Sequence, residues 1–91
     1  MNENYLVSEL DAGPEEVVEV KLSAPANVML LTASDYTHYR NNEQFNYYGG
    51  HFGNELMVNL TPPHQGHWYL VVDLGGLPGR VSAYISIKKT A

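Results

Sequence analysis

The sequence predicts an all-β domain, a compact antiparallel β-sandwich of seven or eight short strands with one short helix. Apolar and polar residues alternate with a period of two in several segments, as in strands that bury one face. Clusters containing Gly and Pro interrupt these segments at intervals, where strands must end. Seven Tyr, two Phe and one Trp add to the preference for strands, because aromatic side chains fit a half-buried pleated surface. A small β-barrel is the alternative.

The chain has 91 residues, which is enough for one core, so residues 1–91 are expected to form a single domain. It contains no Cys, and this excludes disulfides and thiolate metal sites. Residues 1–4 lack the basic and apolar regions of a signal peptide. No apolar stretch approaches the length of about 18 residues that a membrane span requires. We therefore expect a cytoplasmic protein that does not cross a membrane.

Charge is unevenly placed along the chain, whose net charge is −5. The segment from Met1 to Glu19 contains no basic residue and holds these acids: Glu3, Glu9, Asp11, Glu15, Glu16 and Glu19. Nucleic-acid binding requires a basic stripe, so no nucleic-acid partner is expected. The acidic segment is expected to aid solubility, and docking of a basic partner is the alternative.

Three segments alternate clearly and are predicted to be strands with one wet face, at residues 16–22, 54–60 and 80–88. The side chains predicted to point inward are Val18, Val20, Leu22, Leu56, Val58, Leu60, Val81, Ala83, Ile85 and Ile87. Weaker patterns predict further strands at residues 5–10 and 44–48.

Two segments are apolar on both faces and are predicted to be the central strands, at residues 28–31 and 68–72. In the second, Trp68, Leu70 and Val72 form one row. Turn residues follow the predicted strands, and Pro62 and Pro63 stop one of them because Pro cannot donate to a ladder. The last connection, rich in Gly and Pro, is expected to be a hairpin.

One segment departs from the strand pattern. Residues 33–42 are predicted to form a helix of one or two turns that crosses between the sheets, with Ser34 or Asp35 as its N-cap. Tyr36 and Tyr39 are three residues apart, which places them on one side of a helical turn.

Two Gly-bounded motifs, Tyr47-Tyr48-Gly49-Gly50 and the run from Pro63 to Gly76 (PHQGHWYLVVDLGG), resemble the domain of unknown function 1883 family. The resemblance also includes residues 16–20, 26–28 and 80–81, and so extends over nearly the whole chain. It implies a bacterial β-sandwich, found alone or attached to other domains such as those of the Toll/interleukin-receptor type. It implies no activity. A strand of the type Gly-x-Trp-Tyr-Leu-Val-Val also occurs in jelly-roll carbohydrate-binding and protease-associated modules, an analogy of fold only.

The aromatic residues are the strongest indication of a binding site, because they are too many to be buried together. The helix, the Tyr47–Gly50 turn and the loop before residue 68 are expected to meet at one end of the sandwich, where loops often bind ligands. The predicted ligand-binding residues are Tyr39, Arg40, Tyr47, Tyr48, Gly49, Gly50, His64 and His67. The alternative is a cluster that only seats the short helix.

His64 and His67 are also weak candidates for a metal site, with His51, His38 or a carboxylate completing the ligand set. Residues three apart on a strand point to opposite faces, so the alternative is that both imidazoles are structural. No cofactor is expected.

Catalytic motifs are missing. The chain has no Gly-x-Ser-x-Gly elbow and no Cys nucleophile, and its Gly clusters lack the Lys of a phosphate-binding loop. Ser34, Asp35 and His38 fall within one helical turn, whereas triad members come from separate elements. We therefore expect a binding or adaptor module for a small ligand or a protein partner. A structural or homo-oligomerising domain is the second hypothesis, and a small metal-dependent enzyme the third.

Overall fold

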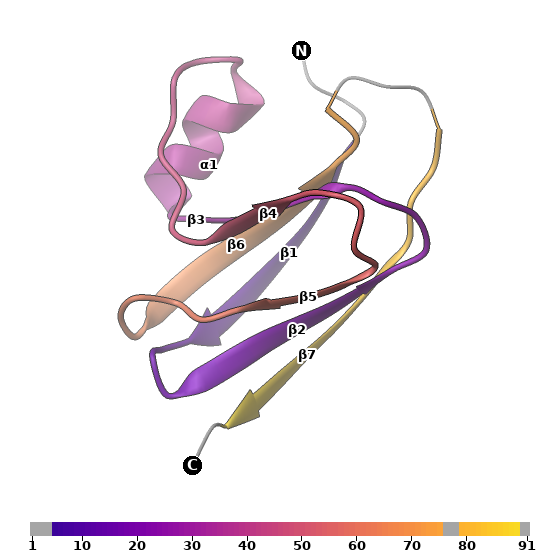
Figure 1. Cartoon of the computed structure of the whole chain (residues 1–91). Coiled ribbons are helices and arrows are strands. Elements are labelled where there is room, and N and C mark those ends of the chain that lie inside the picture. Colours follow the sequence, from indigo (N-terminus) through magenta and orange to yellow (C-terminus); the bar gives the residue numbers. More distant parts are fainter. Residues whose placement is uncertain (1–4, 76–78, 90–91) are drawn as a thin grey trace.

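Two antiparallel sheets stack face to face in the computed structural model, which describes residues 5–75 and 79–89 (Figure 1). The sandwich prediction is confirmed, because the sheets do not close into a barrel. The described residues form seven strands and one helix: β1 (Tyr5–Ala12), β2 (Glu16–Leu22), β3 (Asn27–Leu31), α1 (Ala33–Arg40), β4 (Gly50–Phe52), β5 (Met57–Leu60), β6 (Gly66–Asp73) and β7 (Ala83–Lys89).

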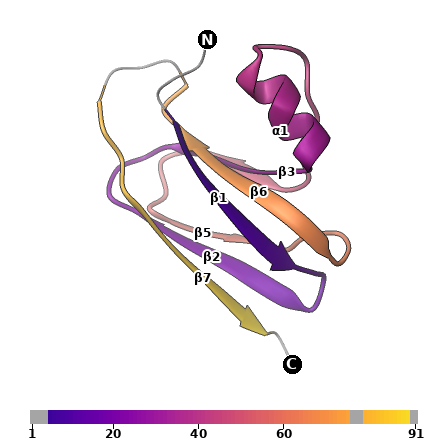
Figure 2. The same ribbon diagram turned by 180° about the vertical axis from the view of Figure 1, so that it is seen from behind.

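One sheet has the strand order β1-β6-β3-β4 and the other has the order β5-β2-β7. The chain changes sheet after β1, β2, β4, β5 and β6, and stays in the same sheet only between β3 and β4. Residues 13–15, 32–49 and 61–65 therefore connect strands at one end of the sandwich, which we call the helix end. The segments that follow β2, β4 and β6 lie at the opposite end (Figures 1 and 2).

The core lies between the sheets and is filled by the inward rows that the alternation predicts. Val18 and Val20 are fully buried, and Leu22, Val58 and Leu60 are buried as well. The two segments predicted as central strands are β3 and β6, which pair with each other in the middle of the four-stranded sheet. Their backbones are covered on both faces, and this explains their continuous apolar sequence.

The helix packs on the outer face of the four-stranded sheet (Figure 2). It begins after Thr32, whose hydroxyl accepts from the Asp35 backbone N–H at 3.2 Å and donates to the Asp35 carboxylate at 2.9 Å. The prediction of Ser34 or Asp35 as N-cap was wrong, because Thr32 supplies the acceptor that the first turn needs. The helix also does not cross between sheets, since it connects β3 to β4.

The predicted strand at residues 44–48 is absent, because the Asp35 carboxylate accepts the Asn46 backbone N–H at 3.1 Å. Pairing with β3 begins only afterwards: Tyr48 N–H donates to the Leu30 carbonyl at 2.9 Å, and Leu30 N–H donates to the Gly49 carbonyl at 3.0 Å. The loop thus reaches β4 already held against β3.

Two predicted strands are shorter than their patterns. β5 starts at Met57 and leaves Leu56 half exposed, and β7 starts at Ala83. Ile87 belongs to the inward row but is 40% exposed, because β7 is an edge strand with no neighbour on its far side among the described strands. The predicted hairpin between β6 and β7 is also wrong, since these strands belong to different sheets. Residues 76–78 of that connection lie outside the described residues.

Among the described residues, no helix has the length and apolar character needed to cross a bilayer.

Candidate interaction surface

Trp68 is the centre of the helix end. The indole is fully buried in the inward row of β6, and its Nε1–H donates to the Ala12 carbonyl at 3.2 Å. The Tyr48 ring packs on the indole with centroids 5.6 Å apart, and the His64 ring does so at 4.8 Å. Two of the predicted site residues, from the segment before β4 and the loop after β5, are thus brought together on a third residue that was predicted in the inward row of a central strand.

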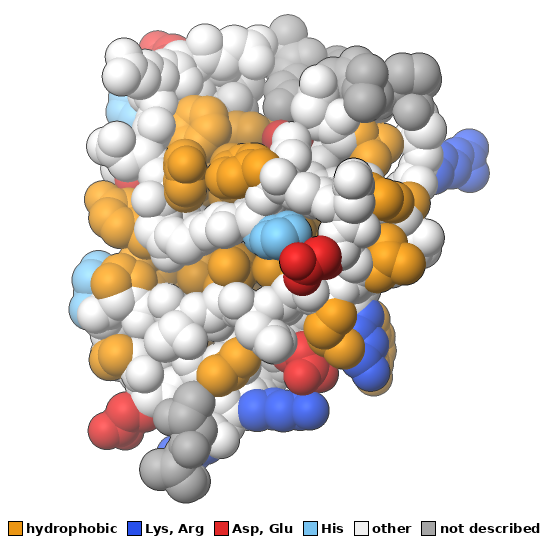
Figure 3. Space-filling model, viewed as in Figure 1, with side chains coloured by type: hydrophobic (Ala, Val, Ile, Leu, Met, Phe, Trp, Pro, Cys, Tyr) orange, Lys and Arg blue, Asp and Glu red, His pale blue; other side chains and the backbone are white. Residues whose placement is uncertain are grey.

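Tyr47 and Phe52 form a second pair of rings at the β4 edge, on the face of the sheet that carries the helix, because Phe52 lies opposite Asn27 in the register. Their rings meet edge to face with centroids 5.4 Å apart, and they are 49% and 53% exposed. We call Tyr47, Tyr48, Phe52 and His64 the aromatic surface. Hydrophobic side chains gather on the face that carries β4 and the segment before it (Figure 3). Phe52 was absent from the predicted site, although it closely follows the Gly49-Gly50 turn.

Gly49 and Gly50 each favour glycine for a different structural reason. Gly49 has φ of 109°, a backbone conformation that favours Gly. A Cβ on Gly50 would lie 3.2 Å from the Val28 carbonyl oxygen and 3.1 Å from the Phe52 ring, so a side chain would crowd both groups where β4 pairs with β3. The pair therefore turns the chain so that Tyr48 packs inward on Trp68 while Phe52 stays at the surface.

Tyr39 and Arg40 lie on the other face of the four-stranded sheet. Tyr39 is buried, and its hydroxyl donates to the Asp73 carboxylate at 2.6 Å. The Arg40 guanidinium lies 5.7 Å from the centre of the Tyr36 ring. The sheet itself separates these two predicted site residues from Tyr48 and His64, so the predicted group is divided between two faces.

The aromatic residues around the helix form a packed cluster. Tyr36 stacks on Tyr69 with centroids 4.7 Å apart, and Tyr39 meets Tyr5 and Phe45 edge to face. Burial, together with the hydrogen bond to the Tyr5 hydroxyl, raises the pKa of Tyr36 to about 12. These residues therefore match the alternative prediction, in which the aromatic side chains only pack the helix against the sheet.

His67 is on the outer face of β6, beside the β1 edge. Its Nδ1 lies 2.9 Å from Asp11 and its Nε2 lies 2.9 Å from Glu9. Hydrogen bonds to Glu9 and then to Asp11 raise the pKa of His67 above its usual 6.5. The ring stands between the two carboxylates, so its nitrogens face in different directions and the three groups do not converge on one point.

The His residues named as metal candidates are dispersed in the structure. His64 packs on Trp68, His38 pairs with Glu43 at 2.9 Å, and the Nε2 of His51 is buried with no hydrogen-bond partner within the described residues. Over residues 5–75 and 79–89, no group of three or more His, Asp or Glu side chains is arranged to hold a metal ion.

The His67 contacts predict a pH-dependent stability. Because the pKa is raised in the folded state, the stabilisation is complete below pH 6.5 and is lost as pH rises through the folded-state pKa. We expect His67→Gln to lower the thermal midpoint relative to wild type at about pH 5.5 and to have little effect at about pH 8.5. Thermal unfolding followed by circular dichroism measures the difference. A Glu9→Gln/Asp11→Asn variant should remove the same pH dependence, and a difference that grows with pH would contradict the assignment.

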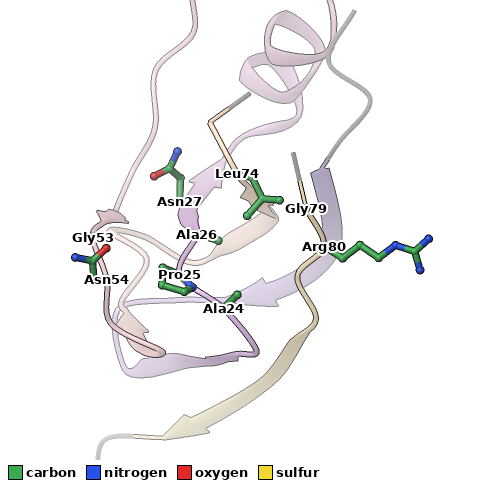
Figure 4. A pocket seen from close by; sticks show the side chains of 9 residues that line it. All are labelled: Ala24, Pro25, Ala26, Asn27, Gly53, Asn54, Leu74, Gly79 and Arg80. Carbon is green, nitrogen blue, oxygen red and sulfur yellow. The ribbon is translucent and has the colours of Figure 1, made fainter. Parts of the chain in front are cut away.

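The opposite end of the sandwich carries an open hollow of about 420 Å³ (Figure 4). Its described lining consists of Ala24, Pro25, Ala26, Asn27, Gly53, Asn54, Leu74, Gly79 and Arg80. The Arg80 side chain extends away from the other labelled side chains. The lining is thus formed mainly by small and backbone groups, in contrast with the ring-rich aromatic surface.

Comparison with known proteins finds one family. The family model described as Domain of unknown function (DUF1883) matches residues 4–91. No curated protein and no solved structure matches the chain. The match includes all seven described strands and the helix, and therefore the whole aromatic surface. The chain belongs to the DUF1883 family.

Proposed function

We propose that this domain is a binding or adaptor module that recognises a protein partner through the aromatic surface. The observation that carries the proposal is the exposure of three rings that are close together in the chain, with Tyr47 at 49%, Tyr48 at 37% and Phe52 at 53%. Tyr and other aromatic residues are enriched in protein interfaces and dominate their binding energy. Exposed aromatic clusters on a small domain are more often interaction sites than surfaces left to water.

The rigidity of the surface supports the same function. Tyr48 is braced by the buried Trp68 and by the backbone pairing with Leu30, and His64 packs on the same indole. Rings that are already held in place lose little conformational entropy on binding, so more of the contact energy appears as affinity. An open aromatic surface suits a protein partner better than a small molecule, which needs an enclosing pocket.

The charge distribution supports a protein rather than a nucleic acid as the partner. The aromatic surface contains no Lys or Arg, and the segment from Met1 to Glu19 has only acids among its charged side chains. We propose a cytoplasmic location, because a domain without Cys is suited to a reducing compartment.

The proposal is tested by photo-crosslinking in cells that express the protein. A benzoylphenylalanine placed at Tyr47 or at Phe52 keeps an exposed aromatic ring, and each is expected to give the same protein adduct. The control position is His38, which is also exposed and at the helix end but on α1. Adducts that are equal at all three positions, or absent at both aromatic positions, would contradict the proposal.

The adduct identifies a partner that can then be titrated. We expect the Tyr47→Ala/Phe52→Ala variant to bind at least about 10-fold more weakly, equivalent to about 1.4 kcal/mol. Calorimetric titration measures this, with His38→Ala as the matched control. An unchanged affinity in the double variant would place the interface elsewhere.

A further inference from the structure

The two flanks of the sandwich end in strands of different length. On one flank the edge strands are β4, with three residues, and β5, with four. On the other flank they are β1, with eight residues, and β7, with seven (Figure 2). Short edges discourage pairing with another chain, whereas a long edge offers a row of unpaired backbone groups. The β1/β7 flank is therefore the side open to strand addition.

β7 has few of the features that protect an edge. It contains no Pro, and no described strand pairs with its outer side. Tyr84, on the face turned away from the core, is 73% exposed, and Ile87, on the core face, is 40% exposed. Two lysines at its end are the only charges, and Lys88 pairs with Glu19 of the neighbouring β2 at 3.4 Å. The strand thus presents an apolar, largely uncharged edge.

A hollow beside β7 shows that the core is reachable from this flank. Its volume is about 230 Å³, and it lies between Leu6 and Val7 of β1 and Ile85 of β7. Leu70 and Val72, which are otherwise buried, also line it. Leu6 pairs with Val72 on the core face, yet it is 42% exposed because nothing described covers this side. Covering the flank would bury apolar surface from both sheets.

We propose that β7 pairs antiparallel with β7 of a second copy of this chain, in a register centred on Ser86. The contact joins two three-stranded sheets into one sheet of six strands. A two-fold axis through the pair makes the contact closed and self-complementary, as in most homodimers.

The register follows from the sequence of β7. Directly opposite residues in an antiparallel pair point to the same face, so a symmetric register must be centred on a residue. Ser86 is the middle of Ala83–Lys89, and only this centre pairs all seven residues. It sets Ile85 opposite Ile87 on the core face, so the half-exposed Ile87 gains an apolar cover, and it sets the exposed Lys89 opposite the small Ala83 at the end of the pair. On the other face it sets Lys88 opposite Tyr84, a contact of a cation with an aromatic ring.

The neighbouring registers are less favourable. A register centred on Ile87 pairs five residues and sets Lys89 opposite Ile85 on the apolar face. One centred on Lys88 sets two ammonium groups directly opposite each other, which is destabilising. Pairing of β7 with β1 of another copy would be heterologous and would leave free edges for further addition. A register centred on Ile85 keeps both lysines outside the pair but joins only five residues, so the Ser86-centred pair is the symmetric register that uses the whole length of the edge.

A cysteine at the two-fold axis tests the register. The chain has no Cys, so Ser86→Cys introduces one thiol per copy, and its Cα atoms would face each other at about 4.5–5.5 Å. This separation permits a disulfide. In Tyr84→Cys the two thiols would be displaced by about four residues, roughly 13 Å, beyond disulfide reach. We expect mild oxidation to cross-link the first variant at least about 10-fold faster than the second.

The dimer itself is measured by sedimentation equilibrium. The expected mass is twice the 10.2 kDa of a single chain. Ile87→Lys puts an inward-facing charge on the edge and is expected to give a folded monomer. Asn59→Lys, which adds the same charge to β5 at the other edge of the same sheet, is the matched control and should stay dimeric.

Three results would overturn the proposal. The first is a protein that stays monomeric at concentrations up to about 200 μM, because its dissociation constant would then be too high for a specific dimer. The second is a dimer that survives Ile87→Lys in a variant whose circular dichroism is native. The third is equal cross-linking of the two Cys variants, which would indicate random collision. Since the aromatic surface is on the other flank, each of these outcomes leaves the proposed protein-binding function untouched.

Discussion

Trp68→Ala is expected to lower the free energy of unfolding by about 3–5 kcal/mol. The indole is fully buried among the inward residues of both sheets, and its removal leaves a cavity that the surrounding strands cannot fill. It also removes the Nε1–H donor from the Ala12 carbonyl and the support of the Tyr48 and His64 rings. Because a domain of this size has a total stability of about 5–15 kcal/mol, the loss is a large part of the whole.

Urea unfolding followed by far-ultraviolet circular dichroism measures the loss, since the variant lacks the only Trp. Trp68→Phe separates the causes, because it keeps most of the apolar volume and loses the hydrogen bond. It is expected to cost about 1–2 kcal/mol. The exposed Tyr47→Ala should stay within about 0.5 kcal/mol of wild type. A Trp68→Ala variant with nearly wild-type stability would show that the indole is not the centre of the core.

Asp73→Ala is expected to cost about 2–4 kcal/mol. The carboxylate is 8% exposed and accepts from three groups: the Tyr39 hydroxyl at 2.6 Å, the Asn27 side chain at 3.1 Å and the Gly75 backbone N–H at 2.9 Å. These groups come from the helix, β3 and the segment after β6. Without the acceptor they are left unpaired at a site with little water, and such groups are costly to leave unsatisfied.

Chemical denaturation of three variants shows how the cost is divided. Asp73→Asn keeps the shape and one carbonyl oxygen, and Tyr39→Phe removes one donor, so each should cost about half as much as Asp73→Ala. Glu55→Ala, at an exposed carboxylate, is the control and should stay within about 0.5 kcal/mol. If Asp73→Ala behaved like the control, Asp73 would not anchor the helix to the sheet.

The sandwich itself could be predicted because strand patterning is local. The inward row of Val18, Val20 and Leu22 follows from alternation along a single strand, whatever the rest of the chain does. The apolar character of β3 and β6 likewise predicted central strands. Edge positions could not be predicted in this way, since Ile87 and Leu56 have the same local pattern as buried residues and differ only in having no covering neighbour among the described segments.

The candidate site was predictable in composition and unpredictable in arrangement. The excess of aromatic residues implied an exposed group, and Tyr47, Tyr48 and Phe52 are exposed. The division between Tyr48 and His64 on one side and the cluster around the helix on the other depended on which face of the four-stranded sheet each loop reached. Sequence spacing carries no information on that choice, because it is decided by contacts between segments far apart in the chain.

Residue types and their periods by themselves determined the strand-rich class, the inward rows and the turns, because these depend on neighbours within a few residues. Tertiary structure alone decided that Tyr48 and His64 meet on Trp68, that Tyr39 commits its hydroxyl to Asp73, and that β7 becomes an edge. The physical reason is that burial and hydrogen bonding compete over the whole chain, and a side chain takes its role from the segments that fold against it.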